Sequence, residues 1–154
     1  MSDWTRSTKE ILVENLPEVV LSLIHKHIEE HNLGSILDET LMCIQTDSLQ
    51  VKKSLFGKTK TVQVSALLTP RWLVWAIQEN MTQPVVLSAQ LINLTVQDYA
   101  QTSFAKMIPD SGIEVNGRFT DSVEGASAFI GLDDGIAAKK FKEIVIKTVQ
   151  DAKK

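Results

Sequence analysis

The sequence predicts an α+β domain in which about seven antiparallel strands form a small β-barrel, with a closing C-terminal helix and an N-terminal helical extension. Residues 40–131 contain short apolar or alternating segments separated by turn residues, a pattern typical of antiparallel strands. Before residue 35 and after Asp134 the apolar residues instead recur every three or four positions, which indicates helices. The length of 154 residues suits a single domain.

The N-terminal residues 1–35 are predicted to form the helical extension, and residues 36–154 the barrel with its C-terminal helix. Ser7 and Glu10 fit a capping box, which predicts a short helical turn through Ile11, Leu12 and Val13. Pro17 suits the first turn of a second helix, and Gly34 suits its end. The predicted inner stripe of this helix consists of Val20, Leu23, Ile24, His27, Ile28 and His31.

The remaining elements follow from changes of period along the chain. The expected strands are 40–46, 49–53, 59–68, 71–78, 85–88, 93–97, 113–119 and 126–131, where 49–53 is either separate or a continuation of the first. Residues 54–58 are expected to form a hairpin tip, and the segment after residue 97 a long polar connection. Asp133 or Asp134 is predicted to cap the closing helix.

The strand at residues 71–78 is apolar on both faces. Its alternating sets are Leu73, Trp75 and Ile77 on one side, and Trp72, Val74 and Ala76 on the other. The outer face of a one-layer barrel would normally contact water, so another element must cover this strand. We expect the N-terminal helix to cover it through Val20, Leu23, Ile24 and Ile28.

Two segments resemble the pleckstrin-homology-like (PH-like) superfamily, which includes bacterial PH-like and GRAM-type domains. Residues 68–75, Leu-Thr-Pro-Arg-Trp-Leu-Val-Trp, resemble the Thr-x-Arg strand entry common in such domains, and residues 125–132 with the following helix resemble their last strand and closing helix. The order of elements over residues 38–152 is similar as well. The chain departs from the eukaryotic pattern because Phe141 stands where a tryptophan is usual in the last helix. The resemblance implies a barrel that binds lipids or proteins, with an early hairpin as the headgroup site.

The charge distribution indicates where a ligand would bind. The chain has 16 basic and 19 acidic residues, a net charge of −3, yet residues 48–78 contain five basic and no acidic residues. Leu55 and Phe56 lie between lysine pairs in this segment. The candidate ligand-binding residues are therefore Lys52, Lys53, Leu55, Phe56, Lys58, Lys60 and Arg71. An edge protected by lysines explains the same charges; alternatively, the tip approaches an anionic membrane, where each lysine contributes about 1 kcal/mol.

Residues 27–31, His-Ile-Glu-Glu-His, match the H-x-x-E-H zinc motif. His27 and His31 lie one helical turn apart and can share a zinc ion, with Glu30 near enough to act as a general base. A hydrolytic zinc site needs a third protein ligand, and the sequence offers no obvious one. We therefore expect no required metal, no cofactor and no catalytic residue, although incidental zinc or nickel binding by the histidine pair is expected.

The leading hypothesis is a non-enzymatic binding module that contacts an anionic membrane surface or a protein partner. The acidic composition argues against a nucleic-acid partner. A small zinc-dependent hydrolase using His27, Glu30 and His31 is one alternative. Another is a self-assembling structural protein, a homo-oligomer whose strand edges pair between copies.

The chain also carries signals about its compartment. Cys43 is the single cysteine, so no intramolecular disulfide can form, and its apolar neighbours predict a buried thiol. Neither a secretory start nor a transmembrane stretch is visible. These features predict a cytoplasmic protein, either free in the cytoplasm or peripheral at the membrane.

Overall fold

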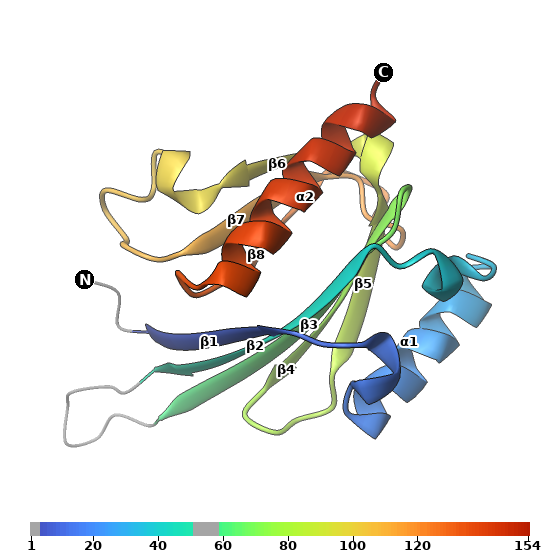
Figure 1. Ribbon diagram of the computed structural model, residues 1–154, viewed down its shortest axis with the longest axis horizontal. Helices are drawn as coiled ribbons and strands as arrows, with labels where there is room; N and C mark the ends of the chain where they lie inside the picture. The colour runs from blue at the N-terminus through green and yellow to red at the C-terminus, as the bar shows by residue number, and fades with distance from the viewer. Residues whose placement is uncertain (1–3, 51–58) are drawn as a thin grey trace.

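In this computed structural model of the protein, which describes residues 4–50 and 59–154, two helices accompany eight antiparallel strands in two sheets (Figure 1). The first sheet has the order β1 (Trp4–Glu10), β2 (Met42–Gln50), β3 (Lys60–Leu68), β4 (Trp72–Glu79), β5 (Val85–Gln90). The second sheet has the order β6 (Leu94–Asp98), β7 (Gly112–Gly117), β8 (Ala126–Gly131). The helices are α1 (Glu18–Glu30) and α2 (Ile136–Ala152). The α+β class and the C-terminal helix are thereby confirmed.

The sheets do not close into a barrel, so the expectation of a closed barrel is wrong. Within the described ranges, consecutive strands pair from β1 through β5 in one sheet and from β6 through β8 in the other, and no ladder connects the two sheets. α2 packs against β6, β1 and β2, and it lies between the edge strands β1 and β6 in Figure 1. The helix therefore fills the side where strand pairing would otherwise have to close the structure.

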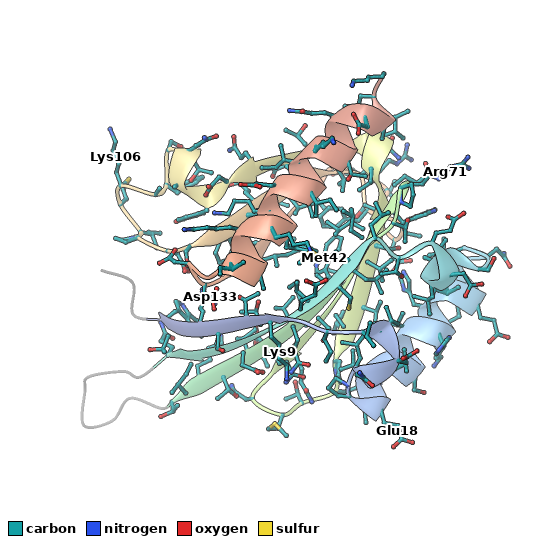
Figure 2. All side chains as sticks on the ribbon, viewed as in Figure 1. Lys9, Glu18, Met42, Arg71, Lys106 and Asp133 are labelled. Atoms are coloured by element: carbon teal, nitrogen blue, oxygen red, sulfur yellow. The ribbon has the colours of Figure 1, made fainter. Side chains whose placement is uncertain are left out.

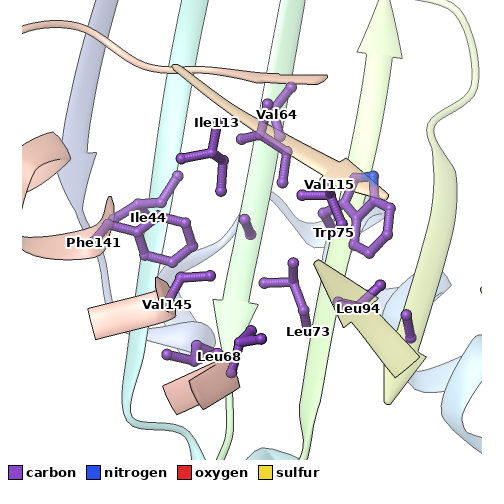
Figure 3. Packing of buried hydrophobic residues seen from close by; sticks show 14 of the residues in the cluster. Ile44, Val64, Leu68, Leu73, Trp75, Leu94, Ile113, Val115, Phe141 and Val145 are labelled. Carbon is purple, nitrogen blue, oxygen red and sulfur yellow. The ribbon is translucent and has the colours of Figure 1, made fainter. Parts of the chain in front are cut away.

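The main core lies between the inner face of the five-stranded sheet, the three-stranded sheet and α2 (Figure 3). Leu73 and Trp75 of β4 face this core and are fully buried, as alternation along the strand predicts. Phe141 and Val145 come from α2 and are also fully buried. One turn separates these two helical residues, so the apolar stripe of α2 packs against both sheets.

α1 covers the outer face of the five-stranded sheet, as the two apolar faces of β4 predict. Val20, Ile24 and Ile28 are buried on its inner side. Their cluster also includes Cys43 from β2, Leu67 from β3, and Val74 and Ala76 from β4. Leu23 differs from the expectation because it is only half-buried at the margin of this contact.

The first seven described residues form a strand, so the capping box predicted at Ser7 and Glu10 is wrong, and the short helical turn lies later, at Val13–Asn15. β1 pairs antiparallel with β2 from Trp4 opposite Gln50 to Glu10 opposite Ile44. Half-buried and exposed side chains alternate from Trp4 to Lys9, which is the period of a strand. The N-terminal segment therefore contributes an edge strand to the sheet as well as α1.

Several element boundaries agree with the sequence and others differ. α1 begins directly after Pro17 and ends before Gly34, which has a positive φ of 74°. β2 is one continuous strand to Gln50. The predicted cap of α2 is wrong, because Gly135 is the N-cap and Asp133 instead accepts hydrogen bonds from the backbone N–H groups of Thr8 and Gly135. Asp133 thus ties β1 to the entry of α2.

A buried ion pair joins β1 to the segment before β7. The Arg6 guanidinium donates to Asp110 Oδ2 at 2.7 Å and to Asp110 Oδ1 at 2.9 and 3.1 Å, and Nη1 donates to Ser48 at 2.6 Å. Phe129 lies 5.5 Å from the guanidinium carbon. Gly131 leaves the room this group needs, because a Cβ there would lie 2.4 Å from Arg6 Nη1. The pair connects the two sheets in addition to the apolar core.

The expectation of a buried Cys43 is confirmed, and it leads to a labelling prediction. Burial beneath α1 raises the pKa of the Cys43 thiol to about 12, so almost no thiolate forms in the folded protein at pH 8. We expect the native protein to resist a disulfide-exchange reagent such as DTNB and the unfolded protein to react fully. The control is Cys43→Ala combined with Ser22→Cys on the exposed face of α1, which should react at once. Rapid labelling of native Cys43 would contradict the packing of α1 on β2.

Candidate functional site

The structure places only two of the seven predicted ligand-binding residues. Lys52, Lys53, Leu55, Phe56 and Lys58, together with the predicted hairpin tip, lie outside the described residues. Lys60 opens β3, and its ammonium lies 3.8 Å from a carboxylate oxygen of Glu79. Arg71 is exposed in the turn between β3 and β4. Lys60 and Arg71 lie toward opposite ends of β3, a strand of nine residues with a length of about 30 Å, so they do not belong to one compact site.

An exposed apolar surface lies in the segment after β6, where the sequence predicted a long polar connection. Between β6 and β7, Phe104, Met107 and Ile108 are 58%, 81% and 63% exposed. Lys106 is exposed among them. Figure 2 shows Lys106 at the upper left of the molecule and Arg71 on the right, and Figure 1 shows the end of β2 and the start of β3 at the lower left. We call residues 102–109 the apolar loop.

Hydrogen bonds hold the apolar loop in this arrangement. Tyr99 Oη donates to the carbonyl of Ile108 at 2.6 Å, and Thr102 Oγ1 donates to the carbonyl of Tyr99 at 2.7 Å. The backbone N–H of Ile108 donates to the carbonyl of Phe104 at 2.8 Å, which closes a turn. The Tyr99 ring packs edgewise on Phe129 of β8, with centroids 5.1 Å apart. The apolar side chains are therefore presented by a fixed turn anchored on a buried ring.

The carboxylates that flank the apolar loop are paired with cations. Asp98, before the loop, receives a hydrogen bond from Lys142 Nζ at 3.0 Å. Asp110, after the loop, is the partner of Arg6. In the part of the chain that the structure describes, no ion pair involves Lys106. The loop thus presents apolar area and one uncompensated positive charge.

Arg71 lines a different hollow at the other end of the sheet. Its volume is about 500 Å³, and it is bordered by Pro70, Arg71, Trp72, Gln90, Ile92 and Ala152. Ile92 is exposed there. No anion-binding set converges in this hollow, since Arg71 is the only charged group among these lining residues.

The two histidines of the H-x-x-E-H motif lie beside an aspartate that the sequence does not bring near them. His31 Nε2 lies 3.1 Å from Asp121 Oδ1, and the His27 and His31 rings are 4.4 Å apart. One ligand atom from each of the three residues lies within 4.8 Å of the other two. Glu30 lines the same hollow of about 220 Å³, with its carboxylate 3.8 Å from the Lys26 ammonium.

His27 is held from its other side by a chain of hydroxyl groups. Its Nε2 lies 2.7 Å from Ser88 Oγ on β5, which lies 2.6 Å from Thr120 Oγ1. Burial, and then the nearby His31, lowers the pKa of His27, while Asp121 and Glu30 act in the opposite direction. The imidazole is therefore mainly neutral near pH 7, the form in which a ring nitrogen can act as a metal ligand.

The residues missed at the sequence level belong to connections. Asp121 is 90 positions after His31 in a turn between β7 and β8, so no local spacing links it to the motif. The apolar loop did carry a signal: Phe104, Met107 and Ile108 are large apolar residues in a segment with no predicted strand or helix to bury them. An unassigned apolar segment of this kind indicates a surface contact as readily as a core residue.

Comparison of the chain with protein-family models, with curated proteins and with solved structures gives no match. None of the described helices is both long and apolar enough to cross a bilayer.

Proposed function

We propose that the protein is a non-enzymatic, PH-like binding module that docks on an anionic membrane surface through the apolar loop. The observation that carries the proposal is the ordered exposure of Phe104, Met107 and Ile108 around Lys106. Fully burying side chains of this size away from water is favourable by roughly 1.5–3 kcal/mol each. The loop is already held in shape, so docking requires little further ordering of the backbone.

Charge supports an anionic surface as the partner. Lys106 is unpaired within the described ranges, and the carboxylates on either side of the loop are paired with Lys142 and Arg6. The acid-free basic segment 48–78 includes the end of β2 and the start of β3, which lie on the left-hand side of the view in Figure 1, as Lys106 does in Figure 2. Cations near an anionic leaflet are attracted, and apolar side chains then slow dissociation.

The arrangement of elements supports a PH-like relationship. Antiparallel strands form two sheets that pack face to face, and one C-terminal helix contacts both. The additional strand β1 and the helix α1 precede the region that resembles this superfamily. Members of the superfamily bind proteins as well as lipids, so the fold class alone does not favour either kind of partner. The apolar loop and its charge are the features that favour the membrane.

Vesicle co-sedimentation tests the proposal. The wild type is expected to sediment with phosphatidylserine-rich vesicles and to remain in the supernatant with phosphatidylcholine vesicles. Phe104→Ser should weaken binding by up to about 1.5–3 kcal/mol, roughly ten- to a hundredfold, at every salt concentration. Lys106→Gln should weaken binding mainly at low salt, because the Debye length is only ~8 Å at physiological ionic strength.

Two further variants make the test specific. Val123→Ser removes an apolar side chain that is 89% exposed, more than Phe104, from the connection between β7 and β8 and should leave binding unchanged. Replacing Lys52, Lys53, Lys58 and Lys60 together with Gln should reduce binding at low salt if the basic segment takes part. Wild-type protein that stays in the supernatant with strongly anionic vesicles at low salt would overturn the membrane proposal and leave a protein partner as the occupant of the loop.

A further inference from the structure

We propose that His27, His31 and Asp121 form a binding site for a divalent transition metal of the zinc type. The inference is independent of membrane docking, because the cluster lies on α1 and on the connection between β7 and β8, away from the apolar loop. The sequence supplied two ligands on one helical face. The fold brings a third ligand to them from a residue 90 positions away.

The ligand set matches the chemistry of this class of ion. Two imidazoles and one carboxylate, each offering an atom within 4.8 Å of the others, can converge by side-chain rotation on one ion at about 2.0–2.2 Å. Nitrogen ligands favour zinc, cobalt, nickel or copper over magnesium and calcium, which prefer oxygen. With three protein ligands the ion keeps an open position, and the adjoining hollow of about 220 Å³ has room for water there.

The surroundings of the cluster orient its ligands. Ser88 Oγ lies 2.7 Å from His27 Nε2, a contact that restrains the ring, and binding of the ion through Nδ1 would preserve this contact. The carbonyl of Ser88 accepts hydrogen bonds from Thr120 N–H at 2.8 Å and from Thr120 Oγ1 at 3.1 Å. Thr120 directly precedes Asp121. One residue of β5 therefore positions both an imidazole ligand and the segment that carries the carboxylate ligand, as outer partners do in metal sites.

A bound ion would connect two elements that are far apart in sequence. It would join α1 to the connection between β7 and β8 across the edge of β5, at the margin of the contact between α1 and the sheet. Because the unfolded chain holds these ligands apart, the ion would bind the folded state preferentially and raise its stability. Metal binding can therefore be measured as an increase in the stability of the folded protein, without an activity assay.

Cobalt titration of protein made without a histidine tag tests the inference. We expect one equivalent of Co²⁺ to give a visible d–d absorption spectrum, and Zn²⁺ to displace it. His31→Gln and Asp121→Asn alter partly exposed side chains, so both variants should fold. Each should weaken Co²⁺ binding at least about tenfold, and Ser88→Ala should weaken it by about 10–100-fold.

The matched control is His25→Gln, which removes the one histidine outside the cluster, on the exposed face of α1. It should bind Co²⁺ as the wild type does. Zn²⁺ should raise the melting temperature of the wild type and of His25→Gln but not of His31→Gln or Asp121→Asn. Equal Co²⁺ affinity in wild type, His31→Gln and Asp121→Asn would overturn the site, as would an unchanged melting temperature of the wild type at saturating Zn²⁺.

Discussion

Phe141→Ala is expected to lower the free energy of unfolding by about 3–5 kcal/mol. Phe141 is fully buried where α2 packs against both sheets, so its removal leaves a cavity that neither sheet can fill alone. In a chain of this length the loss corresponds to a fall in melting temperature of about 6–20 °C. Urea denaturation followed by circular dichroism measures both the stability and the slope of the transition.

The matched control on the same helix is Ile136→Ala. Ile136 is 89% exposed, and alanine is the better helix former by a few tenths of a kcal/mol. Its stability should therefore remain within about 0.5 kcal/mol of the wild type. A small effect of Phe141→Ala, similar to that of Ile136→Ala, would contradict the position of α2 between the two sheets.

Asp110→Ala is expected to destabilise the protein by about 3–5 kcal/mol, because it leaves the guanidinium of Arg6 buried without a charge partner. The two side chains are only 8% and 12% exposed. Combining Asp110→Ala with Arg6→Met should recover much of the loss, since the methionine side chain is uncharged and suits the neighbouring Phe129 ring. Equilibrium unfolding of the single and double variants measures this coupling.

The pair formed by Lys140 and Glu10 is the control for the buried ion pair. It also joins β1 to a distant element, at 3.2 Å, but its side chains are 58% and 51% exposed. Glu10→Gln should therefore cost less than about 1 kcal/mol. Equal losses in the free energy of unfolding for Asp110→Ala and Glu10→Gln would show that burial of Arg6 adds little to the cost of losing its partner.

Most elements after residue 40 could be predicted because their local signals agree with their tertiary partners. β4 has apolar residues on both faces, which predicts that both faces are buried. The prediction that α1 packs on its outer face follows from that single observation. β1 could not be recognised in the same way. Ser7 and Glu10 offer a helix cap, but pairing with β2 along all seven residues stabilises the strand, and that partner begins more than 30 residues later.

The arrangement of the sheets depends on contacts that sequence periodicity does not encode. Alternation in β6, β7 and β8 shows which side chains point inward, but it cannot show that α2 replaces strand pairing between β6 and β1. The ligands of the candidate metal site also differ in how visible they are from the sequence. The histidine spacing on α1 is local and visible, whereas Asp121 reaches it only through the turn after β7, which Ser88 holds.

The hydrogen bonds that connect β1 to residues far downstream have a consequence for synthesis of the chain. Arg6 meets Asp110 and Thr8 meets Asp133, partners 104 and 125 positions downstream. A ribosome adds about 5–20 residues per second, so about 5–20 s separate the appearance of Ile44 in β2 from that of the last turn of α2. During that interval the inner face of the growing five-stranded sheet has no helix to cover it. The nascent chain therefore exposes this apolar face to solvent until α2 has been synthesised and can pack on it.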